Sequence, residues 1–203
     1  MKKWIVLLFF CAGLFAKDLQ IYIVHGYGST SDYGWLPSIA QELQEDKNSV
    51  WVPNLPKPFE PKLQEWLLSM QENFTKLDNK TYFITHSLGG VALLDFLSTQ
   101  DENTRIGGVI MVSPFDEPLK ILPVLDDFVE AKRDYKKLQK MIKHIVIISA
   151  KDDSVVPTTM SERLAKKLNA KFIQTQSGGH FMESEGFKKM PLVVQEFKKI
   201  END

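Results

Sequence analysis

Short apolar runs rich in Val and Ile alternate along this chain with longer amphipathic runs, and this alternation most constrains the fold. The β-type runs cover residues 19–24, 49–52, 81–85, 106–113, 144–150 and 171–175. Several are apolar at consecutive positions, as in strands buried on both faces of a parallel sheet. Helical periodicity covers residues 35–45, 62–77, 89–98, 125–142, 159–168 and 186–200. We therefore expect an α/β fold, a three-layer α/β/α sandwich around a mostly parallel sheet of about six strands.

Local signals add detail to this expectation. Thr159 followed by Glu162 predicts a capping box at one helix start. Pro61 is suited to the first turn of another helix. The basic run Lys132–Lys143 carries apolar residues at helical spacing, which indicates an amphipathic helix with a solvated cationic face. A role at an anionic membrane surface is the alternative for that run.

Composition indicates one ordinary globular domain. The chain has 203 residues, and 43% of them are hydrophobic and 25% charged, which is enough for one sizeable core. The formal net charge of −1 lacks the basic excess typical of nucleic-acid binding, so no nucleic-acid partner is expected. We find no internal repeat, linker or low-complexity tract, and we expect a single domain over residues 17–203.

The first sixteen residues have the organisation of a secretory signal peptide. Lys2 and Lys3 precede thirteen uncharged, largely apolar residues that end at Ala16. As a helix this run would rise about 20 Å, which is less than the roughly 30 Å of a bilayer core. We expect cleavage after Ala16 and a periplasmic or secreted protein without stable membrane insertion; a retained anchor is the alternative. The single cysteine, Cys11, would leave with this segment, and Phe10 before it is too bulky for the usual lipoprotein processing site.

The segment Thr85-His-Ser-Leu-Gly-Gly90 joins a predicted strand to a predicted helix. A serine on such a turn, with Gly two positions later, is the pattern of the nucleophile elbow of α/β-hydrolases. The turn exposes the hydroxyl of Ser87 and points the first amides of the helix at a reacting carbonyl. Ser-x-Gly also occurs in ordinary turns, so this segment needs support from the rest of the chain.

An acid and a histidine follow later predicted strands. Functional groups of a parallel sheet gather at the carboxyl ends of its strands. Asp152 and Asp153 follow the fifth predicted strand, and His180 follows the sixth. Ser, Asp and His in that chain order match hydrolase triads, in which His deprotonates Ser and a carboxylate orients His. An acid followed by three residues and then Pro is the usual arrangement, which favours Asp153, with Asp152 as a solvated neighbour.

Backbone amides complete the predicted site. The amide of Leu88 and one from Gly26 or Tyr27 are the candidates for an oxyanion hole. We interpret His25 and His86 as packing or hydrogen-bonding residues at the rim of the site. No set of spaced Cys, His and Asp residues predicts a metal, and no cofactor is expected.

With these motifs, the chain resembles the small serine hydrolases related to retinoblastoma-binding protein 9. The resemblance extends from His25 to the last predicted helix and includes Trp35-Leu-Pro, the Pro-rich tract 52–58 leading to Trp66, and Glu185-Gly-Phe187. It implies a minimal α/β-hydrolase fold without a large cap domain, with Ser87, Asp153 and His180 as the triad. Thr85 is a departure, because the family usually has Gly there. The signal peptide departs from the family's intracellular animal members.

We therefore expect a carboxylesterase-like serine hydrolase (EC 3.1.1) that acts on a small or extended acyl substrate. Trp35, Phe115 and Phe181 are candidates for apolar substrate-binding walls, with Tyr27 and Phe59 as further possibilities. Peptide or amide hydrolysis would use the same triad and remains an alternative. A non-catalytic binding protein on a hydrolase scaffold is a second alternative, because a fold does not determine a function.

Overall fold

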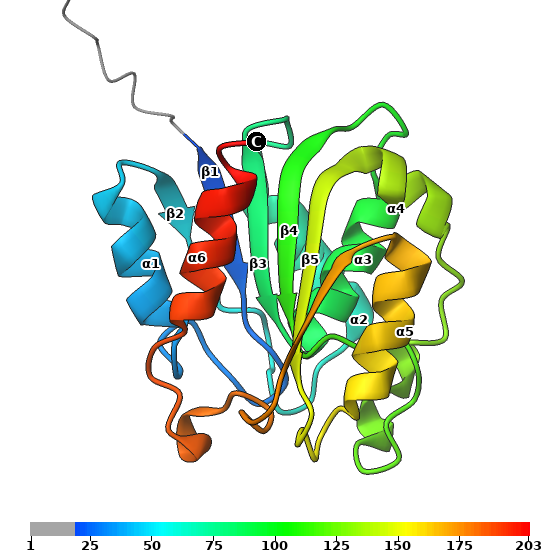
Figure 1. Cartoon of the computed structure of the whole chain (residues 1–203). Coiled ribbons are helices and arrows are strands. Elements are labelled where there is room, and N and C mark those ends of the chain that lie inside the picture. The colour runs from blue at the N-terminus through cyan, green and yellow to red at the C-terminus, as the bar shows by residue number, and fades with distance from the viewer. Residues whose placement is uncertain (1–18) are drawn as a thin grey trace, which may run out of the picture.

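Six parallel strands form one twisted sheet in the computed structural model, which describes residues 19–203 (Figure 1). The strand order is β2-β1-β3-β4-β5-β6, and every neighbouring pair is parallel. The strands are β1 (Gln20–Val24), β2 (Ser49–Trp51), β3 (Thr81–His86), β4 (Ile106–Val112), β5 (Ile142–Ala150) and β6 (Lys171–Thr175). All six strands predicted from the apolar runs are thus present.

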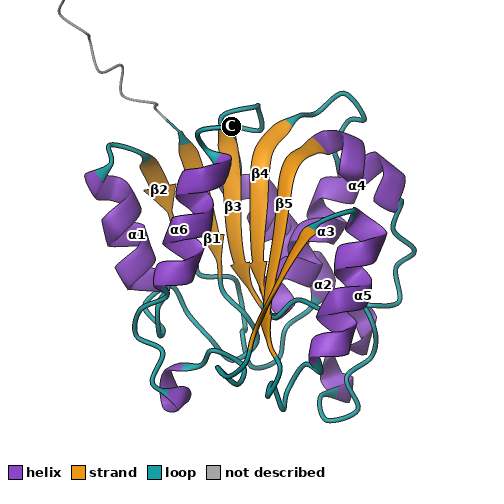
Figure 2. Cartoon of the chain, in the orientation of Figure 1, coloured by secondary structure: helices purple, strands orange, loops and turns teal. Residues whose placement is uncertain are grey.

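Helices cover both faces of the sheet and make the predicted three layers (Figure 2). One face carries α1 and α6, and the other carries α2, α3, α4 and α5. The helices are α1 (Leu36–Glu45), α2 (Leu63–Asn73), α3 (Leu88–Thr99), α4 (Tyr135–Met141), α5 (Thr158–Leu168) and α6 (Pro191–Ile200), with short 3-10 helices η1 (Pro123–Phe128) and η2 (Glu183–Glu185).

The core consists of two apolar layers separated by the sheet. Every residue of β3 and β4 is buried, which explains why these strands are apolar at consecutive positions rather than at alternate ones. One layer lies against α2, α3 and α5 and includes Trp66 and Phe96. The other lies against α1 and α6 and includes Trp35 and Phe197. Helix α3 packs against the centre of the sheet, and ten of its twelve residues are buried.

The prediction of one long helix over residues 125–142 is wrong. The structure has η1, an irregular segment and the short helix α4 there, and Ile142 already belongs to β5. Arg133 causes the interruption, because its guanidinium turns inward and donates to both carboxylate oxygens of Asp95 at 2.7 Å. It also donates to the carbonyl of Phe128. Asp134 then caps α4 by accepting from the amide of Lys137 at 3.1 Å.

Three other helix starts differ from the prediction. Helix α5 begins at Thr158 without the capping box, because Pro157 is the N-cap residue and Thr159 already lies inside the helix; Glu162 pairs with Lys166 on the next turn. Helix α2 begins at Leu63, two residues after Pro61. Helix α6 begins at Pro191, because Gly186 has φ 93° and interrupts the helical pattern that starts there.

The carboxyl ends of the strands meet at the lower edge of the sheet in Figure 1. The strand order reverses direction between β1 and β3, which is where ligands bind in open α/β sheets. No helix among residues 19–203 is long and apolar enough to cross a membrane. The predicted signal peptide, including Cys11, lies outside the described residues.

Candidate active site

Ser87 lies at a sharp turn between β3 and α3. Its backbone has φ 50° and ψ −122°, a conformation that costs a non-glycine residue on the order of 1–3 kcal/mol. Two backbone hydrogen bonds hold the turn: Ser87 donates its amide to the carbonyl of Val112 at 2.8 Å, and Gly90 donates to the carbonyl of Ser87 at 2.9 Å. The predicted nucleophile elbow is therefore present in the backbone.

Glycines make room for this turn. A Cβ atom on Gly89 would lie 2.4 Å from the carbonyl oxygen of His25, so only glycine lets α3 approach the end of β1 this closely. A Cβ atom on Gly90 would lie 3.0 Å from Oγ1 of Thr85. The space that Gly90 leaves accommodates Thr85, which is fully buried, at the position where the resemblance leads one to expect Gly.

His180 and Asp153 form a buried hydrogen-bonded pair. Nδ1 of His180 donates to Oδ2 of Asp153 at 2.9 Å, and both side chains are almost completely buried. Burial opposes the charge of Asp153, but the hydrogen bonds from His180, the amide of Val156 and the hydroxyl of Ser113 outweigh it and hold the pKa below its ordinary value. The carboxylate therefore stays charged, and the Nδ1–H tautomer leaves Nε2 of His180 free to accept a proton.

The carboxylate of Asp153 has partners beyond His180. Its Oδ1 accepts from the amides of Val155 and Val156 at 2.9 and 2.8 Å. Its Oδ2 also accepts from the hydroxyl of Ser113, which lies just after β4, at 2.8 Å. Sequence reasoning missed Ser113, because its contact with Asp153 depends on the pairing of β4 with β5. A positive φ of 48° at Ser113 was likewise invisible in the sequence.

Three hydrogen bonds hold the loop that carries His180, and we call residues 179–181 the base loop. The amide of Gly179 donates to Oδ1 of Asp152 at 2.9 Å. Nε2 of His86 lies 2.8 Å from the carbonyl oxygen of His180, and as the donor it carries the proton. Nε1 of Trp35 donates to the carbonyl of Phe181 at 3.0 Å. Three consecutive residues of the base loop are thus held by Asp152 after β5, by His86 at the elbow and by Trp35 just before α1.

One of these contacts revises the sequence interpretation, and another agrees with it. Asp152 is exposed but is more than a solvated neighbour of Asp153, because it anchors Gly179. His86 is hydrogen-bonded at the site as expected. Burial, and after it the nearby His180, lower the pKa of His86 to about 3. His86 therefore acts as a neutral donor at all ordinary pH values.

His25 joins the predicted oxyanion turn to the Pro-rich loop. Its Nδ1 lies 2.9 Å from the carbonyl oxygen of Gly26, and its Nε2 accepts from the amide of Leu55 at 2.9 Å. Burial lowers the pKa of His25, which favours this neutral state. The amide of Gly28 is already used, because it donates to the carbonyl of Pro58 at 2.8 Å. Tyr27 and Gly26, together with Leu88 at the start of α3, remain the candidate oxyanion donors.

A cavity of about 330 Å³ opens beside Ser87, and His86 and His180 also line it. Its apolar side consists of Ile121, Leu122, Val155 and Met182. Tyr27, Ser29 and Tyr33 line it from the β1–α1 loop.

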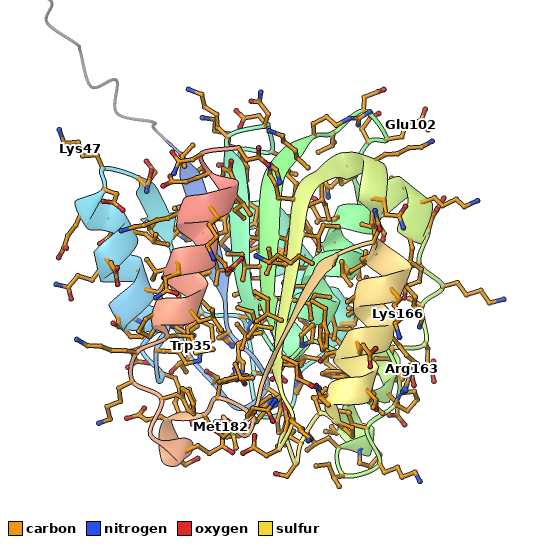
Figure 3. The ribbon with its side chains drawn as sticks, in the orientation of Figure 1. Trp35, Lys47, Glu102, Arg163, Lys166 and Met182 are labelled. Atoms are coloured by element: carbon orange, nitrogen blue, oxygen red, sulfur yellow. The ribbon has the colours of Figure 1, made fainter. Side chains whose placement is uncertain are left out.

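The aromatic walls predicted at Trp35, Phe115 and Phe181 are placed elsewhere by the structure. Each of these rings is at most 2% exposed and packs in the core. Trp35 instead holds the base loop through its hydrogen bond to the carbonyl of Phe181. Figure 3 labels Trp35 and Met182 in the lower half of the molecule, with Met182 nearer its lower edge. Phe59 is 67% exposed and contacts the ring of Tyr27 edge-on.

No group of three or more His, Cys, Asp or Glu residues in the described chain is arranged to hold a metal ion. Ser87 and His180 line one cavity at this edge, His180 is hydrogen-bonded to Asp153, and the three residues follow the chain order of a hydrolase triad. Such a set can perform nucleophilic acyl transfer without a cofactor.

Comparison with known proteins identifies the family. The sequence model of the serine hydrolase family matches residues 21–199. The chain belongs to the serine hydrolase family. The Bacillus subtilis protein YdeN, whose name marks it as a hydrolase, is 37% identical over 174 residues, which is 86% of this chain and 92% of YdeN. The rat serine hydrolase RBBP9 is 24% identical over 173 residues, covering 84% and 90% of the two chains. The resemblance to small hydrolases related to retinoblastoma-binding protein 9 is confirmed.

Solved structures agree on the fold. The crystal structure of the ydeN gene product superposes with a TM-score of 0.89 at 35% identity, covering 91% of this chain and all of that one. Est1E from Butyrivibrio proteoclasticus, solved with ferulic acid bound, has a TM-score of 0.64 at 18% identity and covers 90% of this chain and 91% of that one. This serine hydrolase thus has the predicted α/β-hydrolase fold, and residues 19–203 include no large cap domain.

Proposed function

We propose that this serine hydrolase is a carboxylesterase that works through an acyl-enzyme on Ser87. The observation that carries the proposal is that His180, hydrogen-bonded to Asp153, lines the same cavity as the strained Ser87. Esterase chemistry is favoured over a binding role because each group that acyl transfer needs is present. The crystal structure titled polyneuridine aldehyde esterase has the same fold, with a TM-score of 0.63, and supplies a precedent for esterase activity on this scaffold.

The proposed reaction has two steps. In the first, Oγ of Ser87 forms a bond to the acyl carbon while Nε2 of His180 takes the hydroxyl proton. The alcohol then leaves with that proton as its bond to the acyl carbon breaks. In the second step, water gives a proton to His180 and attacks the acyl carbon. The acid is released, and Ser87 regains its proton from His180.

The other groups lower the barriers of these steps. Asp153 remains ionised, so it stabilises the imidazolium that forms twice in each cycle. The amide of Leu88, with that of Tyr27 or Gly26, is proposed to receive the oxyanion. The turn that strains Ser87 also directs the amino end of α3 toward the oxyanion.

Labelling by a fluorophosphonate probe tests the proposal. We expect the purified protein to be labelled and Ser87→Ala to be unlabelled, with a loss of kcat on the order of 10⁶ on a p-nitrophenyl ester. Ser154→Ala is a matched control, because Ser154 is an exposed serine next to Asp153. Labelling that persists in Ser87→Ala would refute the assigned nucleophile.

We also propose that the hydrolase is exported to the periplasm or secreted. Support comes from the sequence of residues 1–16, where Lys2 and Lys3 precede a short apolar run that ends in Ala16. N-terminal sequencing of the protein from its native host tests this, with Lys17 expected as the first residue. A chain that still begins at Met1 would contradict cleavage.

A further inference from the structure

The cavity beside Ser87 has an apolar side built from three separate segments. Ile121 and Leu122 come from the segment after β4, Val155 from the β5–α5 loop, and Met182 from the segment before α6. Ile121 is also 62% exposed. Apolar surface therefore continues from the inside of the cavity to its mouth. An acyl chain too long for the cavity could still contact this apolar surface where it extends out of the mouth.

No Asp, Glu, Lys or Arg in the described chain lines this cavity. Asp153, the carboxylate that pairs with His180, already accepts four hydrogen bonds, from His180, Ser113, Val155 and Val156. The imidazole of His86 is neutral. An ion that entered would therefore find no fixed charge of opposite sign along the walls.

Burial of such an ion is costly. A charged group that loses water without gaining a counter-charge loses several kcal/mol of solvation, whereas an apolar group gains about 25 cal/mol for each Å² removed from water. The cavity volume of about 330 Å³ is at the lower end of small-molecule sites, so a short or medium acyl group fills it.

We propose that the substrates are neutral esters with an uncharged, apolar acyl group of medium length that packs against Ile121, Leu122, Val155 and Met182. Acyl groups that end in a carboxylate are excluded. This inference rests on the proposed function, because it concerns the acyl group that Ser87 would carry.

A matched pair of substrates tests the inference. The p-nitrophenyl ester of hexanoic acid and the mono-p-nitrophenyl ester of adipic acid have the same chain length, and a carboxylate replaces the last methyl in the second. We expect kcat/KM for the hexanoate to exceed that for the adipate by on the order of 10².

Two lysine variants locate the effect. Ile121→Lys places a cation at the cavity mouth, at a side chain that is already 62% exposed, so folding should tolerate it. Val124→Lys is the control, because Val124 lies in the next turn, is 49% exposed and does not line the cavity. We expect Ile121→Lys to reduce the ratio of kcat/KM for the hexanoate to that for the adipate by about tenfold. Val124→Lys should leave this ratio unchanged.

The outcomes separate the inference from the proposed function. Equal kcat/KM for the two esters, with both activities lost in Ser87→Ala, would overturn the acyl preference and leave the esterase intact. An equal change in both lysine variants would also overturn it, because the effect would then be long-range. If Ser87→Ala still hydrolysed both esters, the proposed function itself would be refuted.

Discussion

His86 is the residue through which we expect the elbow to control the position of His180. The hydrogen bond from its Nε2 to the carbonyl of His180 is 2.8 Å long and buried. His86→Phe keeps a ring of similar size against Trp35, whose ring lies 5.7 Å away edge-on, but removes the donor. The base loop would then keep two of its three anchors.

The size of the effect follows from the carbonyl that is left without a donor. An unsatisfied buried acceptor costs about 1–3 kcal/mol. If that cost appears in the transition state, because His180 has moved from its best position, kcat falls by about 5- to 150-fold. We expect KM to change less than kcat, because the ring at the cavity is retained.

Two amide variants separate the hydrogen bond from packing. The side-chain amide of Gln can occupy the place of Nε2 of His86, whereas that of Asn reaches only as far as Nδ1. We expect His86→Gln to recover most of kcat and His86→Asn to remain as slow as His86→Phe. Steady-state kinetics on p-nitrophenyl hexanoate, with thermal melting of each variant, makes the measurement. If Gln is as slow as Phe, or if melting temperatures fall while kcat is unchanged, His86 has a structural role only.

Three further predictions follow from the site. The pKa of about 3 at His86 is far below the ordinary 6.5, so between these values the unfolded chain binds a proton that the native protein does not. The free energy of unfolding should therefore fall on acidification, by about 2 kcal/mol between about pH 7.5 and pH 5 from His86 alone. In urea melts, His86→Gln should lose this contribution to the pH dependence and keep the contribution of His25. An unchanged pH dependence in His86→Gln would contradict the buried neutral state. Asp153→Asn should lower kcat by on the order of 10⁴, whereas Asp152→Asn retains an acceptor for Gly179 and should cost less than tenfold; the reverse ranking on a p-nitrophenyl ester would show that the carboxylates are misassigned. Thr85→Gly should leave activity intact or raise it while lowering the melting temperature, because buried side-chain atoms are removed from β3; an inactive, folded variant would refute our account of the elbow.

The sheet could be predicted because burial on both faces leaves a continuous apolar pattern. Residues 81–85 and 106–113 were found as strands for this reason, and β3 and β4 are indeed fully buried. The long helix over 125–142 could not be corrected from sequence. Arg133 looks like one cation among many in a basic run, and only the fold brings Asp95 of α3 within 2.7 Å of it.

The residues of the candidate site also divide into those that local sequence patterns predict and those that only the packing of the fold brings together. Ser87, Asp153 and His180 each follow a strand, so local patterns were enough to select them. Ser113 needed the packing of β4 beside β5, which no local pattern encodes. The predicted aromatic walls relied on side-chain size rather than position. Trp35 packs in the core against the base loop, the ring of Phe181 is buried within that loop, and smaller residues such as Val155 line the cavity instead.

The acyl-enzyme on Ser87 is the central claim, and its direct test is mass spectrometry of the quenched reaction. Mixing the protein with p-nitrophenyl hexanoate and quenching in acid should give a burst of p-nitrophenol and a hexanoyl mass on the peptide that contains Ser87. His180→Ala should form this species far more slowly, because no base then takes the hydroxyl proton. A burst-free reaction with the acyl mass on another residue, or unchanged formation in His180→Ala, would contradict the account.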